Sequence, residues 1–161
     1  IWGFDNRNIK TIVVNYPGNT AESFRIDVTD TEAILKDISG SVIENFNVEA
    51  VNLYLAAFRK TTYEGAIVFT DGIYDKMDSV KNAGEIISIY VEPKRGESIE
   101  MKAYKINAKP DMTDSEGNLM LWDPDRLYGV INENTYVLVQ NYGLQYVLKG
   151  MSDFKYASGL Q

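Results

Sequence analysis

Apolar residues between positions 47 and 60 recur at the spacing that places them on one face of an α-helix. Asn47 is a suitable N-cap, because its side chain can accept a hydrogen bond from the first turn. Arg59 and Lys60 put positive charge at the end where the helix dipole favours cations. The predicted buried face consists of Val48, Val51, Tyr54, Leu55 and Phe58, with Leu53 at its margin. A helix with such a broad apolar face must be covered by the rest of the chain.

The preceding segment, residues 31–46, shows a second helical spacing. Thr29 lies three residues before Glu32, as in a capping box at the start of a helix. Gly40 interrupts the pattern, since a glycine inside a helix costs ~1 kcal/mol relative to alanine. The apolar positions of this segment are Ile34, Leu35, Ile38, Val42 and Phe46. We therefore expect one bent helix or two short ones.

Elsewhere the apolar period is two, or the run is β-branched, and both patterns are typical of β-strands. Turn sequences between neighbouring runs, such as Pro17-Gly18-Asn19 and Asp71-Gly72, predict hairpins. Residues 75–84 and 107–118 are polar and are expected to be connections. The runs that predict strands are 9–16, 23–29, 66–70, 73–74, 85–92, 98–106, 127–131, 135–140 and 144–148.

The order of these elements is a hairpin, then helices, then a long antiparallel meander. This order predicts an α+β fold with a single domain over residues 1–161. One or two helices, at about 31–46 and 47–60, are expected on one face of the sheet. The termini, 1–8 and 151–161, contain aromatic residues but no predicted element on which these could pack. Such ends either dock on the body of the domain or extend from it to reach a neighbouring molecule.

The composition excludes several chemistries. The 161 residues include no cysteine and no histidine, which excludes thiol nucleophiles, zinc–thiolate sites and hydrolases with a histidine base. We predict that the protein is not an enzyme and has no cofactor. The net charge of -7 opposes binding to nucleic acid, and no apolar run approaches the ~20 residues that cross a bilayer. The start at Ile1 indicates a processed form or a fragment. No targeting segment is visible, and a virion or extracellular location is slightly favoured.

The string Asp37-Ile38-Ser39-Gly40-Ser41, with Thr70-Asp71-Gly72 later in the chain, resembles the metal-ion-dependent adhesion site of von Willebrand A domains. In that family such motifs hold Mg²⁺ through carboxylate and hydroxyl oxygens. The family also has a continuous buried strand before the first aspartate and several strand–helix units between the motifs. Lys36 interrupts the apolar run here, and the intervening sequence accommodates only one helix. The surroundings therefore favour a kinked helix and a hairpin turn.

A weaker candidate for a metal site lies in the polar loop after residue 107. Oxygen-bearing side chains at alternate positions around a glycine suit Ca²⁺. The loop lacks the first alternate aspartate and the distal bidentate glutamate of a complete calcium loop, so a solvated hairpin loop is favoured. The weak candidate ligands are Asp111, Asp114, Glu116 and Asn118.

Aromatic residues crowd the C-terminal third of the chain and also occur near the N-terminus. Tyrosine and tryptophan favour protein interfaces because they bury a large area and keep a polar group available. The alternative is that they cover the core or fill the faces of the sheet. The candidate interface residues are Trp2, Phe4, Trp122, Tyr128, Tyr142, Tyr146, Phe154 and Tyr156.

These features predict a non-enzymatic structural protein that acts through protein–protein contacts, as a homo-oligomer or in a larger assembly. The favoured example is a virion subunit (phage capsid, neck or tail) or a subunit of a surface appendage. A hairpin followed by a helix that ends near Gly65 is similar in order to the extended loop and spine helix of HK97-like capsid proteins, although this chain is too short for that whole fold. Two alternatives stay open: a Ca²⁺- or Mg²⁺-dependent enzyme or binding domain that uses the acidic loop, and a small-ligand pocket between helices and sheet.

Overall fold

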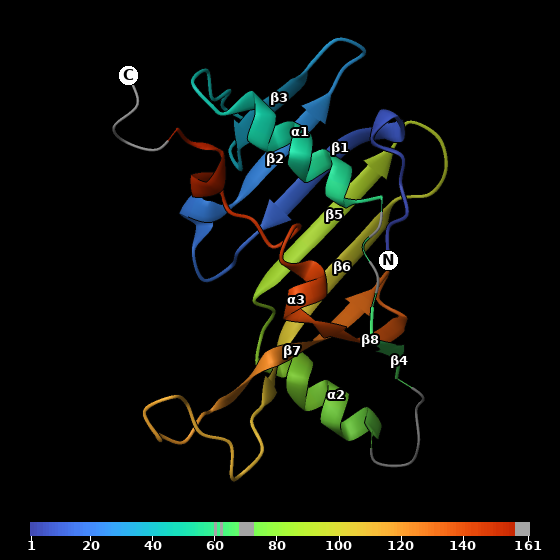
Figure 1. Ribbon diagram of the computed structural model, residues 1–161. Coiled ribbons are helices and arrows are strands. Elements are labelled where there is room, and N and C mark those ends of the chain that lie inside the picture. Colours follow the sequence, from blue (N-terminus) through green and yellow to red (C-terminus); the bar gives the residue numbers. More distant parts are fainter. Residues whose placement is uncertain (60, 62, 68–72, 157–161) are drawn as a thin grey trace.

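The computed structural model describes residues 1–59, 61, 63–67 and 73–156 (Figure 1). Among these residues, eight strands form one antiparallel sheet in the order β3-β2-β1-β5-β6-β7-β8-β4. Three α-helices and three short 3-10 helices accompany the sheet in this part of the chain. The predicted α+β class is therefore confirmed.

The first part of the sheet forms as the alternating pattern predicts. β1 (Ile9–Asn15) pairs with β2 (Phe24–Val28), and Ile12 lies opposite Ile26. Both of these side chains are fully buried. Two short 3-10 helices, η1 (Asn6–Asn8) and η2 (Thr20–Glu22), precede the two strands. The predicted first hairpin is confirmed.

The predicted helix over 31–46 is wrong. Residues Ala33–Asp37 form β3, which pairs with β2 and places Leu35 opposite Ile26 in the core. The chain then turns at Gly40, whose φ is 94°, and residues 41–43 return along the outer edge of β3. The glycine suits this left-handed turn and disfavours a helix. The apolar run Ala33-Ile34-Leu35 is short enough to fit both periods, and pairing with β2 decides between them.

Helix α1 (Val48–Ala57) confirms the predicted helix over 47–60 within the described residues. The side chain of Asn47 accepts a hydrogen bond from the backbone N–H of Ala50, at 3.1 Å. The buried side of the helix is narrower than predicted, since Val48 and Leu53 are exposed. The side chains that it does bury are Val51, Tyr54 and Leu55, followed by Phe58 at the C-cap.

The second part of the sheet consists of β5 (Ile87–Pro93), β6 (Ile99–Asn107), β7 (Trp122–Ile131) and β8 (Thr135–Gln140). The predicted hairpin of 85–92 and 98–106 is confirmed by the pairing of β5 with β6. Asn132 and Glu133, with φ of 46° and 66°, form the turn between β7 and β8. β4 (Gly65–Ala66) pairs with β8 at the edge.

Two further predictions for this part are wrong. Residues Ile73–Asn82 form helix α2 instead of a strand followed by a polar connection. The predicted turn Asp71-Gly72 lies outside the described residues. The predicted strand over 144–148 is replaced by helix α3 (Asn141–Leu144) and a turn, in which the backbone N–H groups of Val147 and Leu148 both donate to the carbonyl of Leu144. Leu144 and Val147 are buried, which is the three-residue spacing of a helical turn.

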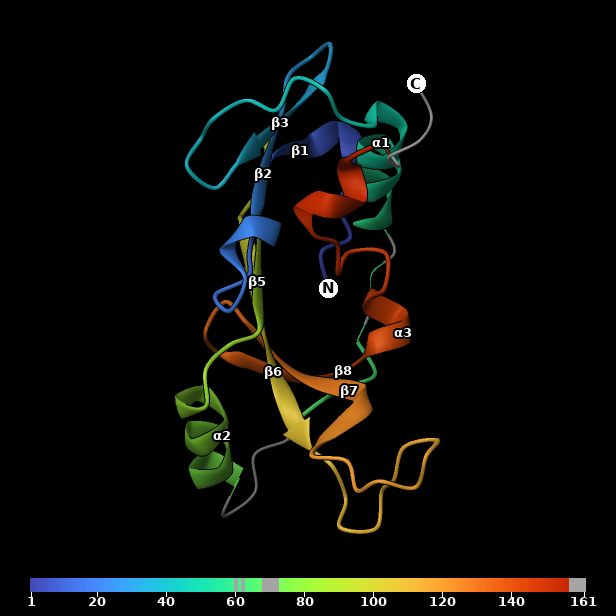
Figure 2. The same cartoon turned by 90° about the vertical axis from the view of Figure 1, so that its left-hand side faces the viewer.

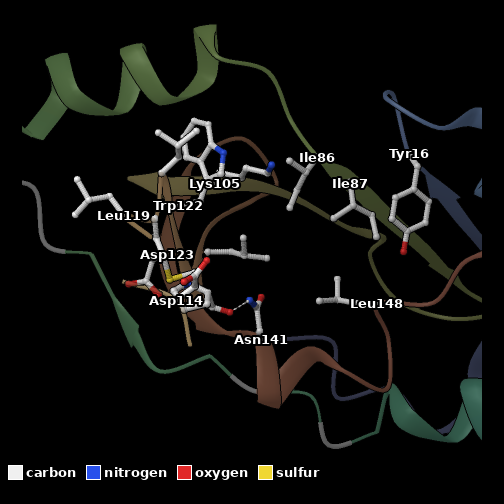
Figure 3. A pocket seen from close by; sticks show the side chains of 14 residues that line it. Tyr16, Ile86, Ile87, Lys105, Asp114, Leu119, Trp122, Asp123, Asn141 and Leu148 are labelled. Carbon is white, nitrogen blue, oxygen red and sulfur yellow. Dashed lines mark hydrogen bonds between the residues drawn. The ribbon is translucent and has the colours of Figure 1, made fainter. Parts of the chain in front are cut away.

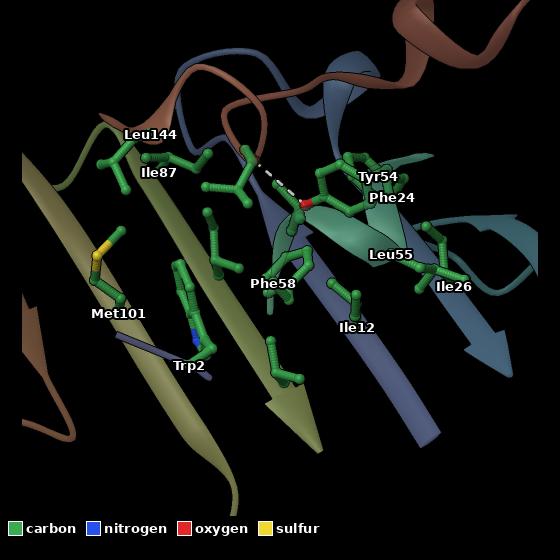
Figure 4. Close-up of a cluster of buried hydrophobic side chains, with 14 of the residues drawn as sticks. Trp2, Ile12, Phe24, Ile26, Tyr54, Leu55, Phe58, Ile87, Met101 and Leu144 are labelled. Carbon is green, nitrogen blue, oxygen red and sulfur yellow. Dashed lines mark hydrogen bonds between the residues drawn. The ribbon is translucent and has the colours of Figure 1, made fainter. Parts of the chain in front are cut away.

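A cluster of aromatic rings fills the core between α1 and the first strands (Figure 4). Phe24 and Phe154 meet edge to face with centroids 4.9 Å apart, and Trp2 and Phe58 do so at 5.1 Å. Tyr54 contacts three of these rings, Phe24, Phe58 and Phe154, and its hydroxyl donates to the carbonyl of Val147 at 3.3 Å.

Both described ends of the chain contribute side chains to this core, which is the docked arrangement of the two that the sequence left open. Trp2 and Phe154 are buried. Phe154 ends the 3-10 helix η3 (Met151–Phe154), in which the backbone N–H and the hydroxyl of Ser152 both donate to a carboxylate oxygen of Glu22 at 2.9 Å. This contact fastens η3 to η2.

Viewed from the side, the sheet bends so that β7 and β8 lie across the lower end of the upright strands (Figure 2). α1, α3 and η3 lie on one face, and α2 lies on the other. The predicted helix over 47–60 thus lies on one face of the sheet, whereas α2, which the sequence did not predict, lies on the other. The connection between β6 and β7, residues 108–121, projects from the lower end of the sheet. We call this segment the arm.

Candidate functional site

An open groove of about 830 Å³ lies where the core face of the sheet meets the arm (Figure 3). It is built by the ends of β1, β5, β6 and β7, by the arm and by the segment around α3. Most of its side chains are apolar. The lining residues are Tyr16, Ile86, Ile87, Lys105, Asp114, Leu119, Met120, Leu121, Trp122, Asp123, Pro124, Leu127, Asn141 and Leu148.

The floor of the groove continues the core. Ile87 and Leu127 are buried and point into the same apolar interior as the aromatic cluster. Ile86 and Tyr16 stand beside Ile87, with Leu148 across from them (Figure 3). The hydroxyl of Tyr16 donates to the carbonyl of Lys149 at 2.9 Å. Burial, together with the charges of Asp153 and Glu22, raises the pKa of Tyr16 to about 12, so this phenol stays protonated at neutral pH.

The opposite wall carries Trp122, the first residue of β7. It pairs with Asn107 at the end of β6, and the ammonium group of Lys105 lies 5.1 Å from the centroid of its ring. This distance is within the range of a cation–π contact. The tryptophan side chain is 40% exposed. The indole is therefore held in one place while part of its apolar surface remains in water.

The arm is ordered by its own backbone. The N–H of Met120 donates to the carbonyl of Met112, and the N–H of Asp114 to the carbonyl of Asn118, both at 2.9 Å. These bonds make a small hairpin that turns at Gly117, where φ is 86°. The leucines at its base are nevertheless 71% exposed at Leu119 and 79% exposed at Leu121. The conformation of the arm thus presents apolar side chains to solvent.

The weak candidates for metal ligands build the tip of this arm. One carboxylate oxygen of Asp114 accepts from the backbone N–H groups of Glu116 and Asn118, both at 2.9 Å. The hydrogen bonds from Asn118 are the main reason why the pKa of Asp114 lies below its ordinary value. Asp111 and Glu116 are exposed. In the part of the chain that the structure describes, no group of three or more acidic, histidine or cysteine side chains is placed to hold a metal ion.

The motif that resembles a metal-ion-dependent adhesion site forms the turn after β3. One carboxylate oxygen of Asp37 accepts from the hydroxyl of Ser39 at 2.6 Å and from the backbone N–H of Ser41 at 2.9 Å. These bonds lower the pKa of Asp37. A strand does precede Asp37, contrary to our expectation, but it belongs to an antiparallel hairpin. Thr70-Asp71-Gly72 lies outside the described residues.

The predicted interface residues fall into three groups according to their burial. Trp2 and Phe154 are buried within the chain, so they are not available to a partner of this folded form. Phe4 and Tyr128 are partly buried. The exposed members are Trp122, Tyr142, Tyr146 and Tyr156, of which Trp122 lines the groove.

Sequence reasoning did not assign Leu119, Leu121, Lys105 or Asn141 to a site. The available signal was the short apolar run at 119–122, directly after the polar residues of the loop. The amide of Asn141 donates to the carbonyl of Pro124 at 2.6 Å, which joins α3 to the start of β7 across the groove (Figure 3).

Comparison with known protein families, with curated protein sequences and with solved structures finds no match to this chain. Among the described residues, no helix is both long and apolar enough to cross a membrane.

Proposed function

We propose that this chain is a non-enzymatic assembly domain that acts through protein–protein contacts. The observation that carries the proposal is the exposure of ordered apolar side chains, Leu119, Leu121 and Trp122, beside an open apolar groove. Exposed leucines that occur singly need no explanation, but a contiguous apolar surface marks an interaction site. A partner that covered this surface would remove it from water.

The proposed setting is a virus or phage particle, in its capsid, neck or tail, or a surface appendage. Repeated protein–protein contacts hold such assemblies together, and this use requires neither the histidine nor the cysteine that the chain lacks. Supporting features are the exposed tyrosines Tyr142, Tyr146 and Tyr156, which keep further aromatic surface available for contact.

The proposal is tested by affinity capture from cells or particles of the source, with the wild-type chain and the double variant Leu119→Asn/Leu121→Asn as baits. The captured protein, or the chain alone, is then studied by sedimentation velocity with purified components. We expect the wild-type chain to form a complex of defined stoichiometry and the variant to lose it with an unchanged circular dichroism spectrum. A wild-type chain that forms no complex with itself or with a purified captured protein would contradict the proposal.

A second candidate function is binding of a small apolar ligand. The groove volume of about 830 Å³ favours it, because ligand pockets commonly measure roughly 300–1,000 Å³. Lys105 and Asn141 lie in its wall as polar groups that could orient a ligand. Native mass spectrometry of the freshly purified protein tests this candidate, since a resident ligand adds a discrete mass that Trp122→Ala should lose.

A further inference from the structure

We infer that the groove receives an apolar segment of a partner protein that carries lysine or arginine on both sides of its apolar residues. This inference rests on the proposed function and adds the chemistry of the partner. It follows from two features of the same surface, the apolar interior of the groove and the acidic residues around it.

The interior selects apolar side chains. Ile86, Leu148 and Leu127 line one part of the groove, and Leu119 and Leu121 of the arm line another. The groove is open to solvent and is not closed into a cavity, so an extended segment of chain can enter and leave it. Side chains of the partner would replace water against the exposed leucines and Trp122.

The rim selects positive charge. Residues 108–126, which form the arm and the start of β7, contain five acidic and two basic side chains. Of the two basic residues, Arg126 lies 3.7 Å from a carboxylate oxygen of Glu64 and is partly neutralised. Among the charged side chains that line the groove itself, Asp114 and Asp123 outnumber the single cation, Lys105. The exposed carboxylates of Asp111, Glu116 and Asp125 belong to the same segment as these two aspartates. The segment therefore carries an excess of negative charge, which favours a partner with cations beside its apolar residues.

The same charges disfavour a second copy of this chain as the occupant. In a two-fold contact the same acidic surface of both copies takes part, which brings like charges near one another. The whole chain also carries a net charge of -7, so two copies repel at low ionic strength. A basic partner is attracted both by the acidic surface around the groove and by the negative net charge of the whole chain.

The test uses two synthetic peptides with the same leucine–alanine centre, one flanked by lysines and the other by glutamates. The chain contains two tryptophans, Trp2 in the core and Trp122 in the groove, so intrinsic fluorescence reports on the groove. We expect the lysine peptide to shift the tryptophan emission to shorter wavelength. Binding should weaken as salt is added, and the glutamate peptide should bind at least roughly tenfold more weakly. Trp122→Phe should abolish the spectral change while binding persists by calorimetry.

Three variants separate the two features of the groove. Leu121→Asn should weaken binding of the lysine peptide by roughly tenfold, whereas Leu53→Asn, the same change at an exposed leucine of α1 outside the groove, should leave it unchanged. The rim variant Asp111→Asn/Glu116→Gln/Asp125→Asn replaces three carboxylates that accept no hydrogen bond from the described residues, so the fold of the arm should be unchanged. It should weaken binding by roughly fivefold or more and remove most of the salt dependence.

Equal binding of the two peptides, or an unchanged affinity in the rim variant, would overturn the inference. Self-association that Leu121→Asn abolishes would also overturn it, because the occupant would then be a second copy. Each of these three results leaves the proposed function standing if the wild-type chain still forms a defined complex. A chain that binds neither peptide and assembles with nothing contradicts both.

Discussion

Aromatic side chains are buried at one end of this sheet and exposed at the other. At the upper end, Trp2 and Phe154 are buried in the aromatic cluster, with Phe154 only 1% exposed. At the lower end, Trp122 and Tyr142 lie on the surface, and Tyr142 is 79% exposed. Both ends present apolar faces of the same antiparallel sheet. The difference lies in what covers them.

At the upper end, α1 and η3 pack across the sheet. At the lower end lies the arm, whose backbone hydrogen bonds are made within the arm itself. Its leucines are exposed to solvent. Aromatic content therefore does not identify an interface in this chain. An interface is indicated where ordered apolar residues have no covering element. If this distinction is correct, equal substitutions at the two ends must have unequal effects.

The largest expected effect is at the aromatic cluster. Phe154→Ala removes a ring that contacts Phe24 and Tyr54, and should lower the free energy of unfolding by ~3–5 kcal/mol. Tyr142→Ala at the other end should change it by less than ~0.5 kcal/mol. Urea denaturation followed by circular dichroism measures both. A comparable loss in the two variants would show that the lower end is also part of the core.

Within α1 the same contrast can be made between two leucines. Leu55 is buried, and Leu55→Ala should cost ~2–5 kcal/mol of unfolding free energy. Leu53→Ala, two residues earlier on the exposed side of the helix, should have an effect within ~0.5 kcal/mol. Because the same substitution is made at both positions, its effect on helix propensity is the same. The difference in denaturation midpoint therefore measures the effect of burial. Equal midpoints would mean that the helix is rotated from its described position.

Tyr16 lies between the two ends and gives a smaller, pH-dependent effect. Its pKa is about 12 in the folded chain, against an ordinary value of 10.0. The folded state therefore keeps the phenolic proton to higher pH than the unfolded state does. The associated stability is fully present below about pH 10 and is lost as the pH rises through about 12. Tyr16→Phe should reduce the fall in unfolding free energy across this interval, as measured by urea denaturation. A fall as steep as that of the wild type would exclude this role.

The smallest expected effect is that of calcium on the arm. Its tip is held by hydrogen bonds to Asp114, so an ion is not needed to order it. Calorimetric titration with Ca²⁺ should show no binding tighter than about millimolar, the weak end of known calcium modules. A micromolar site that disappears in Asp111→Asn would favour the alternative of a metal-dependent domain. The lower end of the sheet would then be a metal-binding site and not a surface for a protein partner.

The sequence predicts those elements whose pattern agrees with their tertiary role. The alternation of Phe24 and Ile26 with polar residues identifies β2, and the spacing of Val51, Tyr54 and Leu55 identifies α1. β3 was mistaken for a helix because Ile34 and Leu35 fit either period. Its pairing with β2 decides the outcome, and that pairing is a property of the assembled sheet. α2 was missed because its sequence is mostly polar, and among residues 77–82, the part of the helix whose burial is described, Met77 alone is buried.

The groove is harder to predict for a different reason. Its lining extends from Tyr16 to Leu148 and comes from several strands, the arm and α3. No sequence spacing brings these positions together, because the bend of the sheet and the fold of the arm place them. The single local signal was the apolar run of residues 119–122 after a polar loop. The sequence does not distinguish the buried candidates Trp2 and Phe154 from the exposed ones, because neither belongs to a long periodic element.

The contact between Glu22 and Ser152 sets an order of events during synthesis. The two residues are 130 positions apart, and Phe154 reaches the aromatic cluster from the same distant segment. β1, β2 and α1 leave the ribosome well before residue 154 does. Their aromatic side chains therefore remain incompletely buried until residue 154 has been made. Contacts of such separation also slow folding, because a large loop must close before they form. The upper end is the better covered of the two in the folded protein. Its core is nevertheless completed late during synthesis, because it needs Phe154.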